Sequence, residues 1–265
     1  MLGQLNMEGL TKIEVAIKRL QTFEPPEGYY LAFSGGKDSC VVKALANMAG
    51  VKYDAHYNHT SVDPPELIYF IRENHPDVIF NYPRYPDGTR VTMWNLIPRK
   101  KMPPTRLVRY CCEYLKEGGG AGRVVVTGVR NSESVKRRSR SGLEIGKGNR
   151  RRECLDPDNP SDEVMMRICP TKGEIILNPI IDWDESDVWE FIKKNNIPYC
   201  CLYNQGYRRI GCIGCPMSNN QKKELEKYPG YKNAYLAAFR RMLENMENIK
   251  TWQTPEDVME WWLKR

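Results

Sequence analysis

Short apolar runs alternate with stretches of helical periodicity along most of the chain. Five runs rich in β-branched and aromatic residues predict strands at 29–33, 51–56, 78–82, 123–127 and 175–177. Apolar residues three and four positions apart predict helices at 8–21, 41–48, 65–74, 106–116 and 184–194. Strands that alternate with helices in this way predict an α/β fold with a mostly parallel sheet covered on both faces. Residues 218–265 show helical periodicity and no strand signal, which predicts a helical C-terminal tail.

The composition favours a globular chain without a membrane span. Hydrophobic residues make up 41% and charged residues 28% of the sequence, which excludes the collagen, mucin, coiled-coil and disordered classes. The longest apolar runs, such as 124–126, are far shorter than the roughly 18 residues of a membrane helix. The N-terminus has no basic start followed by an apolar stretch, so no secretory signal is visible. We therefore expect a cytoplasmic protein with no membrane partner.

The excess positive charge is concentrated in one segment. Lys and Arg number 40 and Asp and Glu 33, which gives a net charge of +7. Residues 130–152 contain nine basic residues and two acidic ones, so the rest of the chain is neutral overall. This distribution indicates one basic loop that faces a polyanion, rather than a surface coated in positive charge.

A glycine-rich turn joins the first predicted strand to the helix after it. The sequence runs Ser34-Gly35-Gly36-Lys37-Asp38-Ser39. Two glycines allow close approach of a ligand to the backbone, the helix N-terminus attracts anions, and the lysine and serines add charge and hydroxyl donors. These features predict a cradle for phosphate or pyrophosphate, with a solvated turn as the alternative. The turn is not a Walker loop, because Leu31 stands where that pattern has glycine, and no G-x-G-x-x-G is present.

This turn resembles the PP-loop of the adenine-nucleotide alpha hydrolases. Later segments, at 178–183, 187–189, 196–199 and 202–207, look like those of the sulfonucleotide reductases, which reduce phosphoadenylyl sulfate (PAPS) or adenylyl sulfate (APS). The resemblance covers residues 28–217 and implies a doubly wound, mostly parallel sheet with the adenine nucleotide at the carboxyl ends of the strands. It divides the chain into an N-terminal helical extension (1–27), a PP-loop nucleotide-binding and cluster domain (28–217) and a helical C-terminal extension (218–265).

The same resemblance assigns further nucleotide ligands. Gly128, Arg130 and Arg137 match a Gly-x-Arg…Arg segment of the family, and guanidinium groups suit bidentate recognition of phosphate or sulfate. Thr60 lies in a looser match at 59–66, where a helix-entry turn is an equal alternative. Together with residues 34–39 these form the expected nucleotide site. Within this set we expect Lys37, Asp38 and Arg130 to be catalytic, and Mg²⁺ is a candidate companion of the nucleotide.

Nine cysteines in a reducing compartment argue for metal or redox chemistry rather than disulfides. Cys111-Cys112 and Cys212-x-x-Cys215 can supply four thiolates to one metal centre, with zinc or unligated packing left open. Resemblance to the cluster-bearing APS reductases implies a [4Fe–4S] cluster on these four. The adjacent pair Cys200-Cys201 is a weaker candidate for redox or sulfur transfer, while Cys40 is expected to be packed. The loop cysteines, Cys154 and Cys169, have no assigned role.

The reaction is the open question at this stage. Sulfonucleotide reductases attack sulfur with a cysteine in a C-terminal Glu-Cys-Gly-Leu-His motif, and no cysteine follows Cys215 here. We therefore expect an ATP-dependent enzyme of sulfur metabolism that adenylates an acceptor and transfers sulfur. The alternatives are an APS or PAPS reductase with an unusual nucleophile, and a non-enzymatic nucleotide-sensing module. Candidate partners are a sulfur or electron donor protein and a nucleic-acid acceptor at 130–152. The sequence indicates no oligomeric state.

Overall fold

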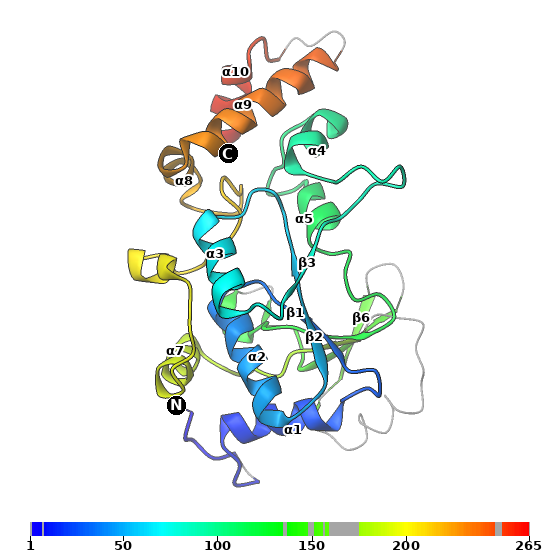
Figure 1. The fold of residues 1–265 in the computed structure, drawn as a ribbon, viewed down its shortest axis with the longest axis vertical. Coiled ribbons are helices and arrows are strands. Elements are labelled where there is room, and N and C mark those ends of the chain that lie inside the picture. The colour runs from blue at the N-terminus through cyan, green and yellow to red at the C-terminus, as the bar shows by residue number, and fades with distance from the viewer. Residues whose placement is uncertain are drawn as a thin grey trace. The chain divides into compact units, whose positions relative to one another are not determined.

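The computed structural model describes residues 2–6, 8–134, 137–147, 151–155, 157–158, 175–246 and 251–264 (Figure 1). The chain divides into two compact units, each built from separate stretches of sequence. The first unit comprises Met1–Tyr57, Tyr69–Ile79 and Gly119–Tyr207, and the second comprises Asn58–Ile68, Phe80–Gly118 and Arg208–Arg265. The sequence analysis expected three consecutive segments with boundaries after residues 27 and 217, and that division stays a prediction.

A seven-stranded sheet forms the centre of the first unit, in the order β3-β2-β1-β4-β7-β5-β6. Its strands are β1 (Tyr29–Ala32), β2 (Tyr53–Asn58), β3 (Ile79–Asn81), β4 (Val124–Val126), β5 (Leu143–Lys147), β6 (Arg151–Leu155) and β7 (Ile175–Leu177). Neighbouring strands among β2, β1, β4 and β7 are parallel, with Leu31 opposite Ala55 on one side and Val126 on the other. The end of β2 and most of β3 belong to the second unit. The predicted α/β fold with a mostly parallel sheet is confirmed.

The basic segment is not simply a loop, which corrects the expectation for residues 130–152. It contains β5 and β6, which pair with each other in antiparallel fashion, and β5 also runs antiparallel to β7. Leu143 and Ile145 are buried, so one face of β5 joins the core. The strand is inconspicuous in the sequence because Glu144, between these two residues, is buried as well.

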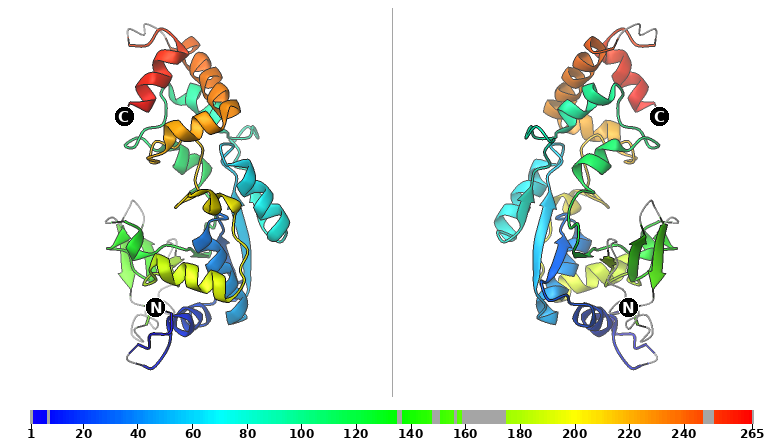
Figure 2. Two further views of the ribbon diagram at one scale, coloured as in Figure 1. Left: turned by 90° about the vertical axis from the view of Figure 1, so that its left-hand side faces the viewer. Right: turned by 90° about the vertical axis from the view of Figure 1, so that its right-hand side faces the viewer.

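Helix α2 (Lys37–Ala49) packs against two other helices of the first unit, α1 (Lys12–Thr22) and α7 (Glu185–Lys194) (Figure 2). Helix α1 begins at a capping box in which Thr11 and Glu14 exchange hydrogen bonds, and α2 ends at Gly50, whose φ of 70° closes the helix. Asp184 is the N-cap of α7, as expected, and its N–H donates to the Asp187 carboxylate at 2.9 Å. The described part of this unit also includes the 3₁₀ helices η1 (Asn131–Glu133) and η3 (Cys201–Gln205). Helix α3 (Pro65–Asn74) is divided between the two units.

The second unit is helical. It contains α4 (Met93–Lys100), α5 (Tyr110–Leu115), α8 (Gln221–Lys227), α9 (Pro229–Glu244) and α10 (Pro255–Leu263). Its apolar core includes Leu96, Phe239 and Trp262, and the Trp262 indole N–H donates to the Pro104 carbonyl at 2.6 Å. The helical character expected for 218–265 is confirmed over the described residues.

Two predicted helix starts were wrong: α1 begins at Lys12 rather than at residue 8, and the helix predicted from residue 106 also begins four residues later. Helix α5 begins at Tyr110 rather than at residue 106, because a turn precedes it in which the Thr105 N–H donates to the Val108 carbonyl at 3.1 Å. The apolar residue in that turn that suggested a longer helix, Leu107, is 91% exposed.

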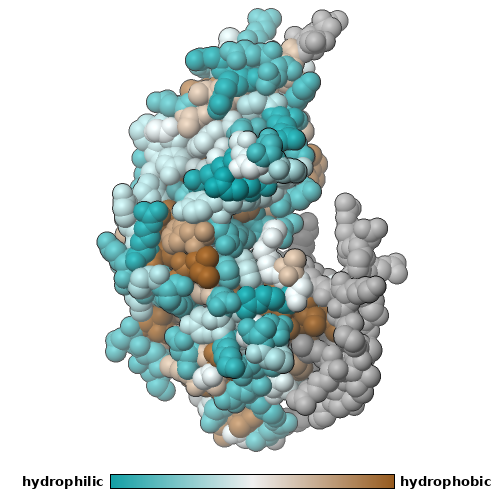
Figure 3. Space-filling model, turned by 45° about the vertical axis from the view of Figure 1, so that its right-hand side comes forward, coloured by the Kyte–Doolittle hydropathy of each residue, from teal (hydrophilic) through white to brown (hydrophobic). Residues whose placement is uncertain are grey.

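On the face drawn in Figure 3, hydrophobic side chains reach the surface as separate patches among hydrophilic ones. Among the described residues, no helix combines the length and apolar character that crossing a membrane requires.

Candidate functional site

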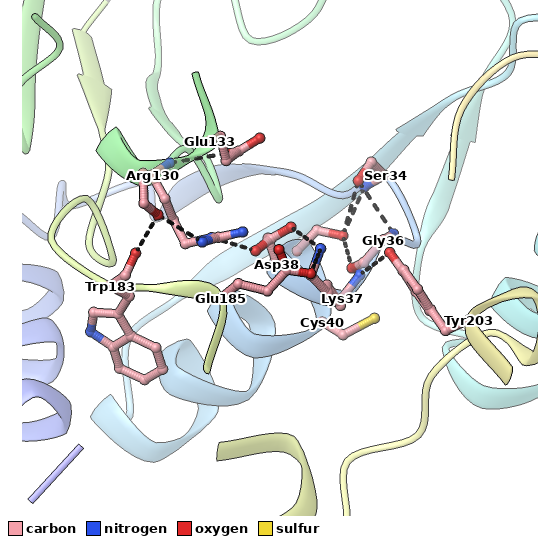
Figure 4. A network of polar contacts seen from close by, with 12 residues as sticks. Ser34, Gly36, Lys37, Asp38, Cys40, Arg130, Glu133, Trp183, Glu185 and Tyr203 are labelled. Atoms are coloured by element: carbon pink, nitrogen blue, oxygen red, sulfur yellow. Dashed lines mark hydrogen bonds and ion pairs between the residues drawn. The ribbon is translucent and has the colours of Figure 1, made fainter. Parts of the chain in front are cut away.

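The glycine-rich turn lies between the carboxyl end of β1 and the start of α2 (Figure 4). Strand β1 is paired with a parallel strand on each side, so its carboxyl end is held in the middle of the sheet. Gly35 has a φ of 70°, which favours glycine, and Gly36 is the N-cap of α2. A Cβ atom on Gly36 would stand 3.3 Å from the Ser34 Oγ and 3.5 Å from the Tyr203 hydroxyl. The two glycines therefore let the chain turn tightly into the helix.

Two serines close the turn with their hydroxyl groups. The Ser39 Oγ donates to the Gly36 carbonyl at 2.9 Å and accepts from the Ser34 N–H at 3.2 Å. The Ser34 Oγ accepts from the Gly36 N–H at 3.3 Å and lies 3.2 Å from the Ser39 Oγ. Both serines predicted as nucleotide ligands thus shape the loop that would receive the ligand.

Lys37 is buried, with only 4% of its surface exposed. Its ammonium Nζ lies 3.5 Å from the Asp38 carboxylate and 3.8 Å from that of Glu185, the first residue of α7. The same ammonium lies 5.5 Å from the centre of the Tyr203 ring, and the Lys37 backbone N–H donates to the Tyr203 hydroxyl at 2.9 Å. Burial raises the pKa of Tyr203, so this hydroxyl stays protonated.

Arg130 brings a second buried cation to the first turn of α2. Its Nε donates to the Asp38 carboxylate at 2.7 Å and its Nη1 donates to the Ser132 Oγ at 3.0 Å. Gly128 permits this arrangement, because a Cβ there would stand 3.0 Å from the Asp38 carbonyl carbon. The structure therefore assembles residues 34–39, Gly128 and Arg130 in one place, and it makes Asp38 the partner of both buried cations.

Two other arginines of the basic segment, Arg137 and Arg140, pair with acidic neighbours. Arg137 forms an ion pair with Glu133, whose carboxylate also accepts the Arg130 N–H at 3.1 Å. Arg140 binds Glu144 through two hydrogen bonds of 2.6 and 3.0 Å. Within this segment Lys136 and Arg150, and further along Cys169, lie outside the described residues, and only backbone is described for Arg151, Arg152 and Cys154. The anion-binding role expected for Arg137 stays a prediction.

The four cysteines expected to bind metal belong to the second unit. Cys111 and Cys112 lie in the first turn of α5, and Cys212 and Cys215 bracket a turn in which the Cys215 N–H donates to the Cys212 carbonyl at 3.2 Å. Gly214 in that turn has a φ of 72°, and a Cβ there would meet side chains of α8, α9 and α10 at 3.1–3.3 Å. Packing of the C-terminal helices therefore fixes the shape of this turn.

The pKa of Cys111 is raised by the other three cysteines of this set as well as by burial. A hydrogen bond between Cys111 and Cys112 raises the pKa of the first and lowers that of the second to about 5, helped by Arg109, whose Nη2 lies 3.4 Å from the Cys112 sulfur. The charges of Cys212 and Cys215 also raise the pKa of Cys111. The Cys212 thiolate in turn is the main cause of the raised pKa of Lys116. The donor set and its surrounding cations are thus of the kind that a metal centre uses. Within the described ranges, however, no three His, Cys, Asp or Glu side chains converge on one ion position.

Thr60, expected to bind the nucleotide, belongs to the second unit. Its hydroxyl donates to the buried Asp63 carboxylate at 2.7 Å and lies 3.5 Å from the Cys212 sulfur. Its nucleotide-binding role stays a prediction. Among the other cysteines, Cys40 is buried beneath the glycine-rich turn with its pKa raised by burial, which agrees with the packing role expected for it. Cys200 is buried and Cys201 is exposed.

Two residues of the loop environment were not singled out from the sequence, Tyr203 and Glu185. Tyr203 lies within the segment 202–207 that contributed to the family resemblance, so a signal for it was present. Glu185 carried no such signal, because its role depends on where α7 packs.

Comparisons with known proteins show the family to which most of the chain is similar. The family model of the phosphoadenosine phosphosulfate reductase domain matches residues 28–218. An uncharacterized protein of Methanocaldococcus jannaschii is 27% identical over 227 residues, which is 79% of this chain and 47% of that protein. The adenosine 5′-phosphosulfate reductase of Allochromatium vinosum is 29% identical over 157 residues, which is 57% of this chain and 52% of the relative. The chain thus spans about half the length of each of these two curated relatives. A crystal structure of PAPS reductase from Candida auris has a TM-score of 0.49 and 17% identity, covering 79% of this chain and 96% of that one.

Proposed function

Because the chain belongs to the phosphoadenosine phosphosulfate reductase domain family, we propose that its first unit binds an adenine nucleotide through the phosphates at Ser34–Ser39. The observation that carries this proposal is the buried ammonium of Lys37 at the N-terminus of α2, beside the backbone of two glycines. The first N–H groups of a helix lack carbonyl partners within the helix, and together with its dipole they favour an anion. Lys37 and Arg130 add two positive charges to that place.

Asp38 acts on the loop as a counter-ion in this proposal. It accepts from Arg130 and lies beside the Lys37 ammonium, so it holds both cations in position while no ligand is bound. Mg²⁺ would then enter with the phosphates of the nucleotide, because the Asp38 carboxylate is already engaged by Arg130.

The reaction we propose is adenylation from ATP. An acceptor oxygen attacks the α-phosphorus, the bond from that phosphorus to the bridging oxygen breaks, and pyrophosphate leaves with the electron pair. Lys37 and Arg130 would stabilise the negative charge that develops on the departing pyrophosphate. The proposal is supported by the place of these two buried cations, which flank the Asp38 carboxylate at the N-terminus of α2.

Sulfonucleotide reduction is the second candidate, and one observation favours it. Cys201 is exposed at the start of η3, the 3₁₀ helix that brings Tyr203 to the loop. Its thiolate could attack the sulfur of APS or PAPS, which would release AMP or its 3′-phosphate and leave an S-sulfocysteine. A dithiol donor protein would then release sulfite and become oxidised to its disulfide.

We further propose that Cys111, Cys112, Cys212 and Cys215 hold a [4Fe–4S] cluster. When bound, such a cluster supplies a centre for electron transfer or sulfur binding. The proposal is supported by the influence of the other three cysteines on the pKa of Cys111 and by the nearby cations of Arg109 and Lys116. Zinc is the alternative occupant of the same four thiolates.

A nucleic-acid acceptor would be recognised by the basic segment 130–152, where Arg137 and Arg140 are paired internally and Arg138 is exposed. A sulfur or electron donor protein would have to serve either reaction.

The decisive experiment offers the reduced, anaerobically prepared protein each of the three nucleotides. ATP is supplied with and without candidate acceptors, including RNA, and AMP and pyrophosphate are measured. APS and PAPS are supplied with thioredoxin, and sulfite is measured. Release of pyrophosphate stimulated by an acceptor supports adenylation, whereas sulfite release that Cys201→Ser abolishes would replace it with the reductase reaction.

Binding without any turnover would support the nucleotide-sensing alternative. The loop itself is tested by Lys37→Ala, which we expect to weaken ATP binding about tenfold or more, because a charge-assisted hydrogen bond contributes about 1.5–3 kcal/mol. Calorimetry measures the affinity, and an unchanged dissociation constant in the variant would contradict the assignment of the loop.

A further inference from the structure

The Tyr203 hydroxyl lies against the backbone of the glycine-rich turn. It accepts the Lys37 N–H at 2.9 Å, and a Cβ on Gly36 would stand only 3.5 Å from it (Figure 4). An oxygen at the N-terminus of a helix, accepting from the first helical N–H, has the position that phosphate oxygens take at such sites. The Tyr203 side chain reaches this position from η3, 166 residues further along the chain.

Tyr203 also engages the side chain of the same lysine. The Lys37 ammonium lies 5.5 Å from the centre of the phenol ring, within range of a cation–π contact. Both groups of Lys37 that the proposed function assigns to the nucleotide, the backbone N–H and the ammonium, therefore face one tyrosine.

We infer that the Tyr203 hydroxyl is a stand-in for a phosphate oxygen, and that a nucleotide phosphate displaces it from the Lys37 N–H. This inference rests on the proposed function of the loop and adds a positioning residue to it. Before binding, Tyr203 keeps the Lys37 N–H and ammonium directed to the ligand position. On binding, the neutral phenol oxygen is exchanged for a charged phosphate oxygen, which is the stronger acceptor.

The segment that carries Tyr203 is suited to such a displacement. Helix η3 ends at Gly206, which has a φ of 87° and no atom within 4 Å of a Cβ placed on it. Asn204 and Gln205 are exposed, so a shift of the segment needs little repacking on that side. Trp189 on α7 meets the Tyr203 ring edge-on, with ring centres 5.3 Å apart. Movement of the phenol therefore changes the surroundings of this tryptophan.

Removing only the hydroxyl tests the inference. Tyr203→Phe keeps the ring and its contacts but removes the competitor for the Lys37 N–H. Because a neutral hydrogen bond contributes modestly to stability, we expect pyrophosphate and ATP to bind roughly three- to tenfold more tightly to the variant. Tyr199→Phe is the matched control: its ring belongs to the same aromatic group, but its hydroxyl donates to Asn204 at 3.2 Å instead of to the loop. We expect the control to bind like the wild type.

The experiment is isothermal titration of the full chain with inorganic pyrophosphate and with ATP, for the wild type and both variants. In parallel, hydrogen exchange of the Lys37 amide is followed without ligand, where Tyr203→Phe should exchange faster. Unchanged or weaker binding by Tyr203→Phe would overturn the inference while leaving the nucleotide site intact. Absence of binding by all three proteins would overturn the proposed function, and the inference with it.

If Tyr203→Phe does not fold, tryptophan fluorescence of the wild type and of Trp189→Phe tests the same displacement. Pyrophosphate should change the part of the tryptophan emission that Trp189→Phe removes. Saturation with pyrophosphate without any such change would also overturn the displacement.

Discussion

Neutralising Asp38 should affect the stability of the protein and its affinity for phosphate in opposite directions. In Asp38→Asn the Arg130 guanidinium, which is 3% exposed, loses the charge of its carboxylate partner at 2.7 Å. The Lys37 ammonium, 5% exposed, loses its nearer counter-ion and keeps only Glu185 at 3.8 Å. Both buried cations then have less charge compensation, which destabilises the fold. A polyphosphate can supply the missing charge, so it should bind more tightly.

The size of the loss follows from the burial of the pair. Removing one partner of a fully buried ion pair costs about 3–5 kcal/mol. The Asp38 side chain is 22% exposed and asparagine keeps one oxygen acceptor, so we expect a smaller loss of about 2 kcal/mol in the free energy of unfolding. Asp54→Asn is a matched control in the same unit, because Asp54 pairs with Arg123 at 2.7 Å while 52% exposed. An exposed pair contributes about 1 kcal/mol at most, so the control should lose less than half as much.

Urea unfolding of the three proteins measures the stability, and titration with pyrophosphate measures the affinity. Equal stabilities of Asp38→Asn and Asp54→Asn would refute the counter-ion reasoning. A catalytic role of Asp38 would appear separately, as a loss of turnover in a variant that still binds pyrophosphate.

Three further changes test the glycine contact, the cysteines and a buried histidine. Gly128→Ala should lower the free energy of unfolding by about 1–3 kcal/mol, because the new Cβ would stand 3.0 Å from the backbone of the first turn of α2. A Cβ at Gly118 would have no atom within 4 Å, so Gly118→Ala should leave urea unfolding nearly unchanged. Anaerobically prepared protein should be brown with about four irons per chain, and Cys212→Ser should lose this iron while Cys201→Ser keeps it; colourless protein with one zinc would contradict the cluster. Burial lowers the pKa of His75 from 6.5 to about 4, so the unfolded chain takes up the proton first as the pH falls. The free energy of unfolding should therefore fall by roughly 2 kcal/mol between about pH 6.5 and pH 4, and His75→Gln, compared in urea titrations at each pH, should remove that part of the slope.

The parallel strands could be predicted from the sequence because a strand buried on both faces is a continuous apolar run, as at 124–126. Strand β5 and helix α4 are among the elements that were missed, for different physical reasons. Strand β5 carries a glutamate, Glu144, that is buried because Arg140 and Asn178 donate to its carboxylate, and the contact with Asn178 is 34 residues distant in sequence. Helix α4 contains Pro98, which normally argues against a helix, yet the Thr92 capping box starts it and burial of Leu96 and Ile97 holds it.

Some residues of the candidate site could be predicted from the sequence, and others reach it only through the fold. Residues 34–39 are contiguous, so their types and order were enough to predict a phosphate loop. Tyr203 and Glu185 reach the loop only because η3 and α7 pack beside α2, and single-sequence patterns do not contain such long-range contacts. The cysteines were predictable as donors from their residue type and spacing, but their electrostatic coupling became visible only with α5 and the 212–215 turn in one unit.

The nucleotide loop has internal partners for the groups that would bind a ligand. Tyr203 accepts the Lys37 N–H, Asp38 and Glu185 face its ammonium, and Asp38 also holds Arg130. A ligand must therefore offer better acceptors than a phenol oxygen and two partly exposed carboxylates. A polyphosphate can do so because it carries several charged oxygens on one molecule, whereas a nucleoside cannot replace these partners. We therefore expect the loop to discriminate by phosphate charge, with the base and ribose contributing through contacts elsewhere in the first unit.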